Sequence, residues 1–101
     1  MSEFITAGKK EDFEEGKGKL IESNGKKIAL YLKDGNFHAF DNECKHMGGP
    51  LCDGSLEEEN IVCPWHGWKY NIKTGVSPVN ADAKVNTYNV KIEDNEVKIE
   101  I

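Results

Sequence analysis

The sequence contains Cys44-Lys45-His46-Met47-Gly48-Gly49-Pro50-Leu51 and Cys63-Pro64-Trp65-His66-Gly67-Trp68, with sixteen residues between His46 and Cys63. Two of the three cysteines and two of the three histidines of the chain lie in these stretches. Thiolate and imidazole ligands together select iron, zinc or copper over magnesium or calcium. Glycine and proline in both stretches indicate tight loops rather than strand interiors. We therefore expect two loops that meet and present two sulfurs and two nitrogens to one metal centre.

These four ligands leave the metal open between zinc and iron. Zinc accepts two cysteines and two histidines, but the Cys44-x-His46 spacing is tighter than the usual separation of about two to four residues between zinc ligands. A two-iron centre instead needs a cysteine pair on one iron and a histidine pair on the other. Two facing loops, each with its cysteine before its histidine, supply that arrangement. A zinc-stabilised interaction module remains the alternative, and it would be colourless where an iron–sulfur protein is red-brown.

Short apolar runs separated by turn residues predict an antiparallel β fold in the rest of the chain. The predicted strands are residues 4–7, 19–22, 26–32, 37–40, 61–62, 69–72, 85–92 and 97–101. Asn24-Gly25 and Asp34-Gly35 are typical of hairpin turns. Strict alternation in residues 90–92 and 97–101 predicts half-buried strands. Residues 10–15 are the only helix candidate, and we expect a solvated loop there because six residues do not sustain a helix alone.

Composition limits the function classes. The 101 residues correspond to one domain, residues 1–101, which is small enough to need help from a metal, a disulfide or a partner. Thirteen basic and eighteen acidic residues give a net charge of −5, which argues against a nucleic-acid partner. The longest apolar run, Ile28–Leu32, is too short to span a membrane. No secretion signal is visible at the N-terminus, so we expect a cytoplasmic location.

Three side chains outside the paired motifs receive structural interpretations. An odd cysteine count argues against a disulfide scaffold, and Cys52 is predicted to be a small apolar residue without a partner thiol. His38 alternates with apolar residues and is predicted to be a strand or surface histidine. The run Glu57–Glu59 is interpreted as a solvated turn, with a docking patch for a basic partner as the alternative.

The two motifs closely resemble the signature of the Rieske 2Fe–2S family. Residues 48–54 and the turn Ile72-Lys73-Thr74-Gly75 are also similar to that family. The resemblance covers the whole chain and implies an all-β fold. The implied fold consists of a Rieske-type antiparallel β-sandwich base domain and a small cluster-binding subdomain. Two loops form this subdomain, which covers approximately residues 41–78.

The resemblance also implies one 2Fe–2S cluster and its ligands. Cys44 and Cys63 would bind the inner iron, and His46 and His66 the outer iron through Nδ1. The residues that it places around these ligands are Gly48, Pro64, Trp68, Tyr70 and Pro78. Tyr70 matches a tyrosine that donates a hydrogen bond to a ligand sulfur in high-potential members of the family; the alternative is that Tyr70 only packs within a strand.

The function implied by this resemblance is that of a one-electron carrier, a Rieske-type ferredoxin. It would connect a flavin-dependent reductase to a terminal oxygenase, as in ring-hydroxylating dioxygenase systems, with both docking near His46 and His66. No catalytic triad, phosphate loop or carboxylate pair is visible, so we expect a component of an oxidoreductase system rather than an enzyme. The alternative is the small Rieske subunit of a larger oxidoreductase such as nitrite reductase.

Apolar side chains near the motifs have two possible roles. Met47, Leu51, Trp65 and Trp68 could cover the cluster or form an exposed rim for docking. For Trp65 the sequence favours neither.

Overall fold

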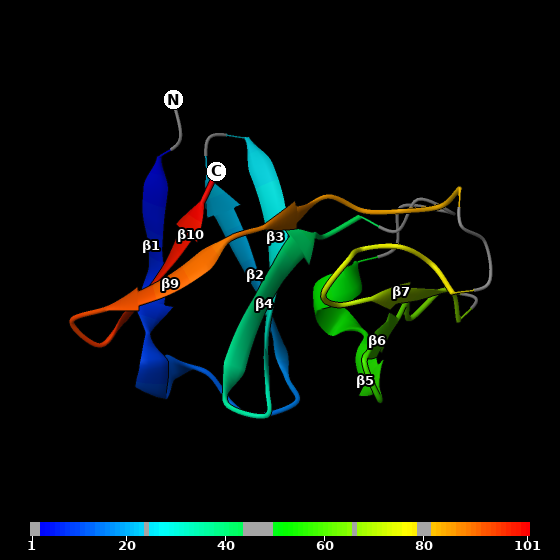
Figure 1. The fold of residues 1–101 in the computed structure, drawn as a ribbon, viewed down its shortest axis with the longest axis horizontal. Coiled ribbons are helices and arrows are strands. Elements are labelled where there is room, and N and C mark those ends of the chain that lie inside the picture. Colours follow the sequence, from blue (N-terminus) through cyan, green and yellow to red (C-terminus); the bar gives the residue numbers. More distant parts are fainter. Residues whose placement is uncertain (1–2, 24, 44–49, 66, 79–81) are drawn as a thin grey trace.

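The computed structural model describes residues 3–23, 25–43, 50–65, 67–78 and 82–101 (Figure 1). The strands of this part of the chain are β1 (Phe4–Lys9), β2 (Gly18–Ser23), β3 (Lys26–Lys33), β4 (Asn36–Asp41), β5 (Ser55–Glu57), β6 (Asn60–Val62), β7 (Lys69–Asn71), β8 (Thr87–Tyr88), β9 (Val90–Glu93) and β10 (Glu96–Glu100). Two single-turn 3₁₀ helices, η1 (Lys10–Asp12) and η2 (Leu51–Asp53), complete the elements. No helix among the described residues is long and apolar enough to cross a membrane.

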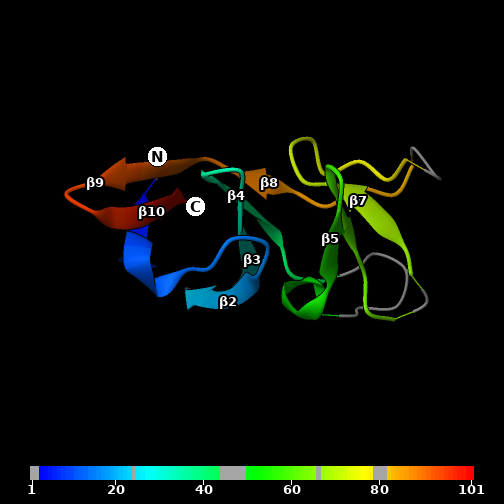
Figure 2. The same ribbon diagram turned by 90° about the horizontal axis from the view of Figure 1, so that it is seen from below.

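The strands form three antiparallel sheets. Two of them make the base of the molecule, in the orders β1-β10-β9 and β2-β3-β4-β8. The third sheet, β5-β6-β7, lies at the end of the molecule opposite the β9–β10 turn (Figure 2). The predicted all-β, antiparallel fold class is confirmed.

Strand β3 belongs to both hydrophobic cores of the described chain. Ile28 and Leu30 face the core between the two base sheets, together with Val97 and Ile99. The intervening Ala29 and Tyr31 face a second core, which extends to the third sheet. Successive side chains of a strand point to opposite faces, so a strand that is buried on both faces reads as a continuous apolar run. This explains why residues 28–32 form the longest apolar run of the sequence.

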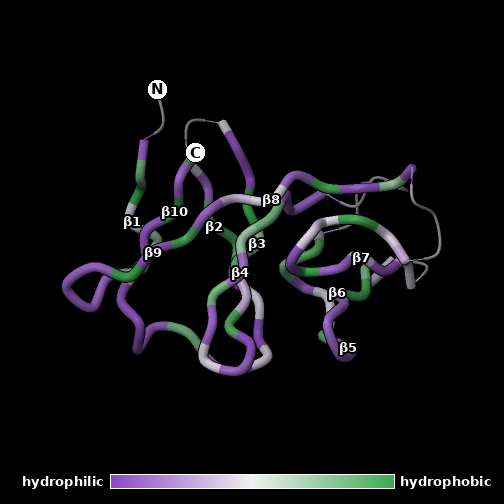
Figure 3. Tube along the Cα trace, in the orientation of Figure 1, coloured by the Kyte–Doolittle hydropathy of each residue, from purple (hydrophilic) through white to green (hydrophobic). Residues whose placement is uncertain are grey.

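The turns that connect these strands carry the polar residues. Asp34 and Gly35 both have positive φ, at 52° and 78°, which confirms the predicted hairpin turn, whereas Asn24 lies outside the described residues. Asp94 and Asn95 make a turn of the same sense between β9 and β10, and Figure 3 shows this turn as hydrophilic.

The predicted strand at residues 85–92 is wrong in its continuity. The chain pairs with β4 through β8 and then, after the exposed Asn89, pairs with β10 through β9. Ile92 is 44% exposed rather than half-buried, since β9 is an edge strand of its sheet. In β10 the alternation is confirmed, because Val97 and Ile99 are fully buried.

Residues 10–15 and residues 51–57 also differ from the sequence expectation. The first segment contains the single turn η1, after which the chain is extended and buries Phe13. The second contains η2 and β5, neither of which was predicted. Both elements are three residues long, too short to show a period in the sequence.

The turn after β7 requires glycine at position 75. Gly75 has φ +79°, and a Cβ built there would lie 2.1 Å from the carbonyl oxygen of Val85. The N–H of Val85 donates to the carbonyl of Gly75 at 2.8 Å, so the two backbones are held in contact. The turn 72–75 is thereby fixed against the strand region that returns to the base sheet.

We predict that Gly75→Ala destabilises the protein more than Gly35→Ala does. Gly35 has nearly the same φ, +78°, but open space around its Cα. An L side chain in this left-handed region costs about 1–2 kcal/mol, and overpacking adds about 1–3 kcal/mol at position 75 alone. Chemical denaturation of both variants measures the difference, and equal losses of unfolding free energy would contradict the close approach at Val85.

A small polar cavity of about 70 Å³ lies between the base sheet that contains β3 and β4 and the region of the third sheet. It is lined by Lys33, Asp34, Asn36, His38, Glu59, Ile72 and Lys73. His38 is half-buried in β4, which confirms its interpretation as a strand histidine. Burial, with the charges of Lys73 and Lys33, lowers the pKa of His38, while Glu59 opposes this effect. Glu59 itself pairs with Lys73 at 3.0 Å.

We predict that the pKa of His38 lies below its ordinary value of about 6.5 and that Lys73→Met raises it. The substitution removes the nearby positive charge and leaves Glu59 free to favour the imidazolium. Because the unfolded chain binds this proton more readily, the stabilisation by neutral His38 is complete above the unfolded pKa and is lost as pH falls below it. NMR titration measures the pKa.

Lys69→Met is the matched control, since Lys69 pairs with Glu57 at 2.7 Å and does not line this cavity. An equal shift of the His38 pKa in both variants would contradict the assigned cause.

Candidate metal centre

The second ligand loop is the connection between β6 and β7. Val62 pairs with Lys69, so residues 63–68 link the two strands. The N–H of Cys63 donates to the carbonyl of Trp68 at 2.6 Å and closes the loop at its base. The hairpin therefore fixes the position of Cys63 through contacts that are local in sequence.

The Cys63 sulfur is buried and accepts a hydrogen bond from the backbone. The residue is 2% exposed, and the N–H of Trp65 donates to its Sγ at 3.4 Å. An N–H donor directed at sulfur stabilises the thiolate form and tunes the potential of an iron–sulfur cluster. Cys63 thus has the chemistry of a buried cluster ligand.

The first ligand loop begins and ends at a pair of bridged residues. Glu43 and Pro50 form an isolated antiparallel bridge, so these two residues lie side by side. The expected ligands Cys44 and His46, together with Met47 and Gly48, lie outside the described residues, as does His66 in the second loop.

The ends of the two loops are packed against each other. A Cβ built on Gly54, just after η2, would lie 2.3 Å from the carbonyl oxygen of Val62, which precedes Cys63. The carbonyl of Leu51 is also close, at 3.2 Å from that position. Only glycine allows this approach of the backbones, so the exit of the first loop and the entry of the second are immediate neighbours.

The apolar residues near the loops divide between core and surface. Leu51 is fully buried in the core that contains Cys63, which agrees with a covering role and not with a place on an exposed docking rim. Trp68 is partly buried and packs on the same core. Trp65 is 48% exposed, which agrees with the rim interpretation for this residue.

Tyr70 and the two prolines occupy different environments. Tyr70 is fully buried in the core that contains Cys63, and its hydrogen bond to a ligand sulfur stays a prediction. Pro64 and Pro78 are exposed.

Cys52 is a free, half-buried thiol outside both loops. It packs against the hydrophobic core that includes Leu51 and Cys63. Burial, with the carboxylate of Asp53, raises the pKa of the Cys52 thiol. A protonated thiol at neutral pH agrees with its interpretation as a small apolar residue.

The acidic run Glu57–Glu59 is largely neutralised by lysines of the same sheet region. Glu57 pairs with Lys69 at 2.7 Å and Glu59 with Lys73 at 3.0 Å. Glu58 occupies the β5–β6 turn with φ 56°. All three carboxylates belong to exposed residues, so the solvated-turn interpretation is favoured over a strongly acidic docking patch.

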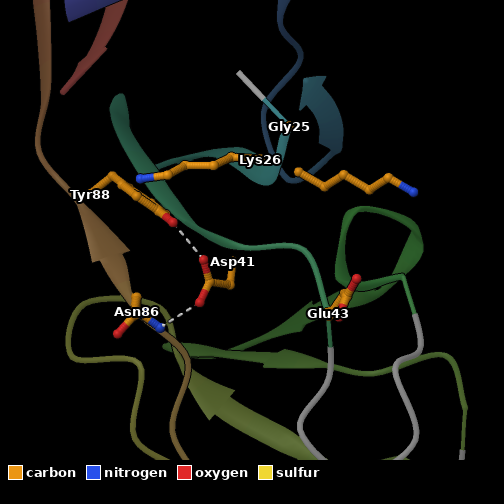
Figure 4. A pocket seen from close by; sticks show the side chains of 7 residues that line it. Gly25, Lys26, Asp41, Glu43, Asn86 and Tyr88 are labelled. Carbon is orange, nitrogen blue, oxygen red and sulfur yellow. Dashed lines mark hydrogen bonds between the residues drawn. The ribbon is translucent and has the colours of Figure 1, made fainter. Parts of the chain in front are cut away.

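A cavity of about 380 Å³ lies beside Glu43, and Figure 4 shows the side chains that line it. Its central carboxylate, Asp41, accepts hydrogen bonds from the Tyr88 hydroxyl at 2.6 Å and from the Asn86 N–H at 3.1 Å. Burial and this bond to Asp41 raise the pKa of Tyr88 to about 12. The sequence interpretation missed this cavity, because its lining is assembled from three separate segments of the chain.

The described residues contain no group of three or more histidine, cysteine or acidic side chains that could hold a metal. Of the four expected ligands, only Cys63 falls among them. Its burial, its N–H donor and the neighbouring exit of the first loop fit a cluster held between the two loops.

Comparisons with known proteins identify the family. Residues 3–89 match the Rieske 2Fe–2S domain. The ferredoxin component of the naphthalene 1,2-dioxygenase/salicylate 5-hydroxylase systems of Ralstonia sp is 38% identical, over 97% of this chain and 95% of that protein.

Two solved structures share the fold. A complex of reduced oxygenase and oxidised ferredoxin in carbazole 1,9a-dioxygenase contains a chain with a TM-score of 0.87 and 23% identity, covering 95% of this chain and 91% of that one. A putative NADH-dependent nitrite reductase small subunit from Mycobacterium tuberculosis has a TM-score of 0.94 and 16% identity, covering 100% and 96%. At these identities the likenesses concern the fold alone.

The match in sequence distinguishes between the open alternatives. It favours the two-iron centre over the zinc module, and the dioxygenase ferredoxins over the nitrite reductase subunit, whose likeness is structural. The chain belongs to the Rieske 2Fe–2S domain family, and its cofactor is one Rieske-type 2Fe–2S cluster.

Proposed function

We propose that this protein carries single electrons from a flavin-dependent reductase to a terminal oxygenase. The observation that carries the proposal is the near full-length similarity to a dioxygenase ferredoxin component. A ferredoxin chain of the same fold occurs in complex with an oxygenase in the carbazole 1,9a-dioxygenase system. The chain is a carrier within an oxidoreductase system and not itself an enzyme.

The proposed ligands are Cys44 and Cys63 for one iron and His46 and His66 for the other. The whole chain, residues 1–101, is proposed to form one domain, with residues 41–78, approximately, as the cluster-binding subdomain. Around the ligands we place Gly48, Pro64, Trp68, Tyr70 and Pro78. The cluster, when bound, supplies one-electron oxidation and reduction. The described residue that supports this set is Cys63, with its buried sulfur and its N–H donor.

Some residues near Cys63 shield the ligand loop from water, and one is exposed for docking of a redox partner. Tyr70, Leu51 and the partly buried Trp68 pack on the inner side of the loop and exclude water there. Trp65 projects an exposed aromatic surface two residues from Cys63. Aromatic side chains are frequent anchors of protein interfaces. We propose that the redox partners dock over Trp65, close to His46 and His66.

We predict about two iron and two acid-labile sulfide per chain in the native protein. Cys63→Ser should abolish the cluster and destabilise the loop region, since metal binding is coupled to folding. Cys52→Ser is the matched control and should retain the full iron and sulfide content, because Cys52 lies outside both loops. Stoichiometric zinc without sulfide, or equal loss of iron in both variants, would refute the proposed centre.

We predict that Trp65→Ala weakens docking to an oxygenase by about 30-fold, as the loss of an interface anchor worth about 2 kcal/mol gives. Stopped-flow reduction of a naphthalene dioxygenase oxygenase component measures the apparent affinity. Ile92→Ala is the control, since Ile92 is similarly exposed, at 44% against 48%, but lies in β9 of the base. Unchanged affinity for Trp65→Ala, or an equal loss in both variants, would contradict docking over Trp65.

A further inference from the structure

The two ligand loops are held at their bases by different kinds of contact. Residues 63–68 are closed by the main-chain bond between Cys63 and Trp68 within one hairpin. The first loop is followed by η2, which forms no ladder with a neighbouring strand. Its exit is therefore positioned by a main-chain bond of Leu51 together with side-chain hydrogen bonds to Leu51 and Cys52.

Asn42 is the residue that links the entry of the first loop to its exit, through its main chain and its side chain. It is 6% exposed and lies two residues before Cys44. Its N–H donates to the carbonyl of Lys27 at 3.0 Å, which continues the pairing of β4 with β3. Its carbonyl accepts the N–H of Leu51 at 2.7 Å, and its Oδ1 accepts the N–H of Cys52 at 2.8 Å.

Tyr31 holds the same exit from the opposite side. This residue of β3 is fully buried, and its hydroxyl donates to the carbonyl of Leu51 at 2.5 Å. Strand β2 also lies against the exit of the first loop, since a Cβ built on Gly18 would lie 2.6 Å from the carbonyl oxygen of Cys52. The N–H and the carbonyl of Leu51 are thus both bonded to residues of the base.

We propose that Asn42, supported by Tyr31, is the positioning residue for the first ligand loop, fixing Cys44 and His46 relative to the second. The inference rests on the proposed ligand set. Residues that orient metal ligands through hydrogen bonds change metal affinity by about 10–100-fold when they are replaced. The two histidine ligands would then depend on separate restraints, His66 on its own hairpin and His46 on side chains of the base sheet.

The test is pulsed EPR of the reduced protein, which reads the nitrogen couplings of the two ligand histidines separately. In Asn42→Ala we expect one coupling to change and the other to stay as in the wild type. We also expect about tenfold faster loss of the cluster to an iron chelator. A general loss of stability would not select one histidine.

Asn71→Ala is the matched control. The Asn71 Oδ1 accepts backbone N–H bonds from Lys73 at 2.8 Å and Thr74 at 3.1 Å, so the chemistry lost is the same, but its bonds hold the turn after β7. Both histidine couplings should stay unchanged in this variant.

Tyr31→Phe decides the question if Asn42→Ala fails to assemble a cluster, since it removes only the hydroxyl that holds Leu51. It should alter the same single coupling. Unchanged couplings in both variants, equal changes of both couplings, or the same change in Asn71→Ala would overturn the proposal. Wild-type protein without two histidine couplings would instead overturn the ligand set itself.

Discussion

Burial of β3 on both faces is the constraint on which the rest of the structure depends. Ile28 and Leu30 close the core between the base sheets, while Ala29 and Tyr31 begin the core that reaches the third sheet. A chain of 101 residues buries a limited fraction of its surface. A strand that is buried on both faces contributes apolar side chains to two cores at once. Because Cys63 belongs to the second of these cores, the proposed ligand loop is anchored to the same strand as the base.

Local sequence signals predict the parts of the fold that are decided by neighbours along the chain. Asp34-Gly35 specifies its turn because both residues take positive φ, and the alternation in β10 survives because the strand is central in its sheet. The break at Asn89 and the exposure of Ile92 have no local signal, because they follow from which sheet each half of the segment joins. Pairing between distant strands was the information that the sequence lacked.

The same distinction applies to the candidate site. The order and spacing of its cysteines and histidines predict a metal centre, their resemblance to the Rieske signature implies the two-iron cluster, and the unmatched Cys52 is recognised because it lacks a partner thiol. The role of Leu51 stayed open because an apolar residue beside a motif is equally compatible with an exposed rim and with the core. Asn42 and Tyr31 were missed for a physical reason: their partners, the backbone groups of Leu51 and Cys52, lie 9 to 20 residues away in sequence, and no local pattern encodes such a pairing.

The two loops are anchored by different contacts, which suits the proposed electron carrier. Trp65 lies on the loop that the main-chain bond between Cys63 and Trp68 closes, and Cys63 packs in the core that contains Tyr31. The exit of the other loop is bonded to Tyr31 of β3 and to the buried Asn42, which follows β4, and such a buried hydrogen bond is costly to break because no water replaces it. Cys63 and the exit of the first loop are thus fixed to the same buried part of the molecule. An electron carrier benefits from such rigidity, because ligands that keep their positions when the charge of the cluster changes reduce the reorganisation that accompanies each transfer.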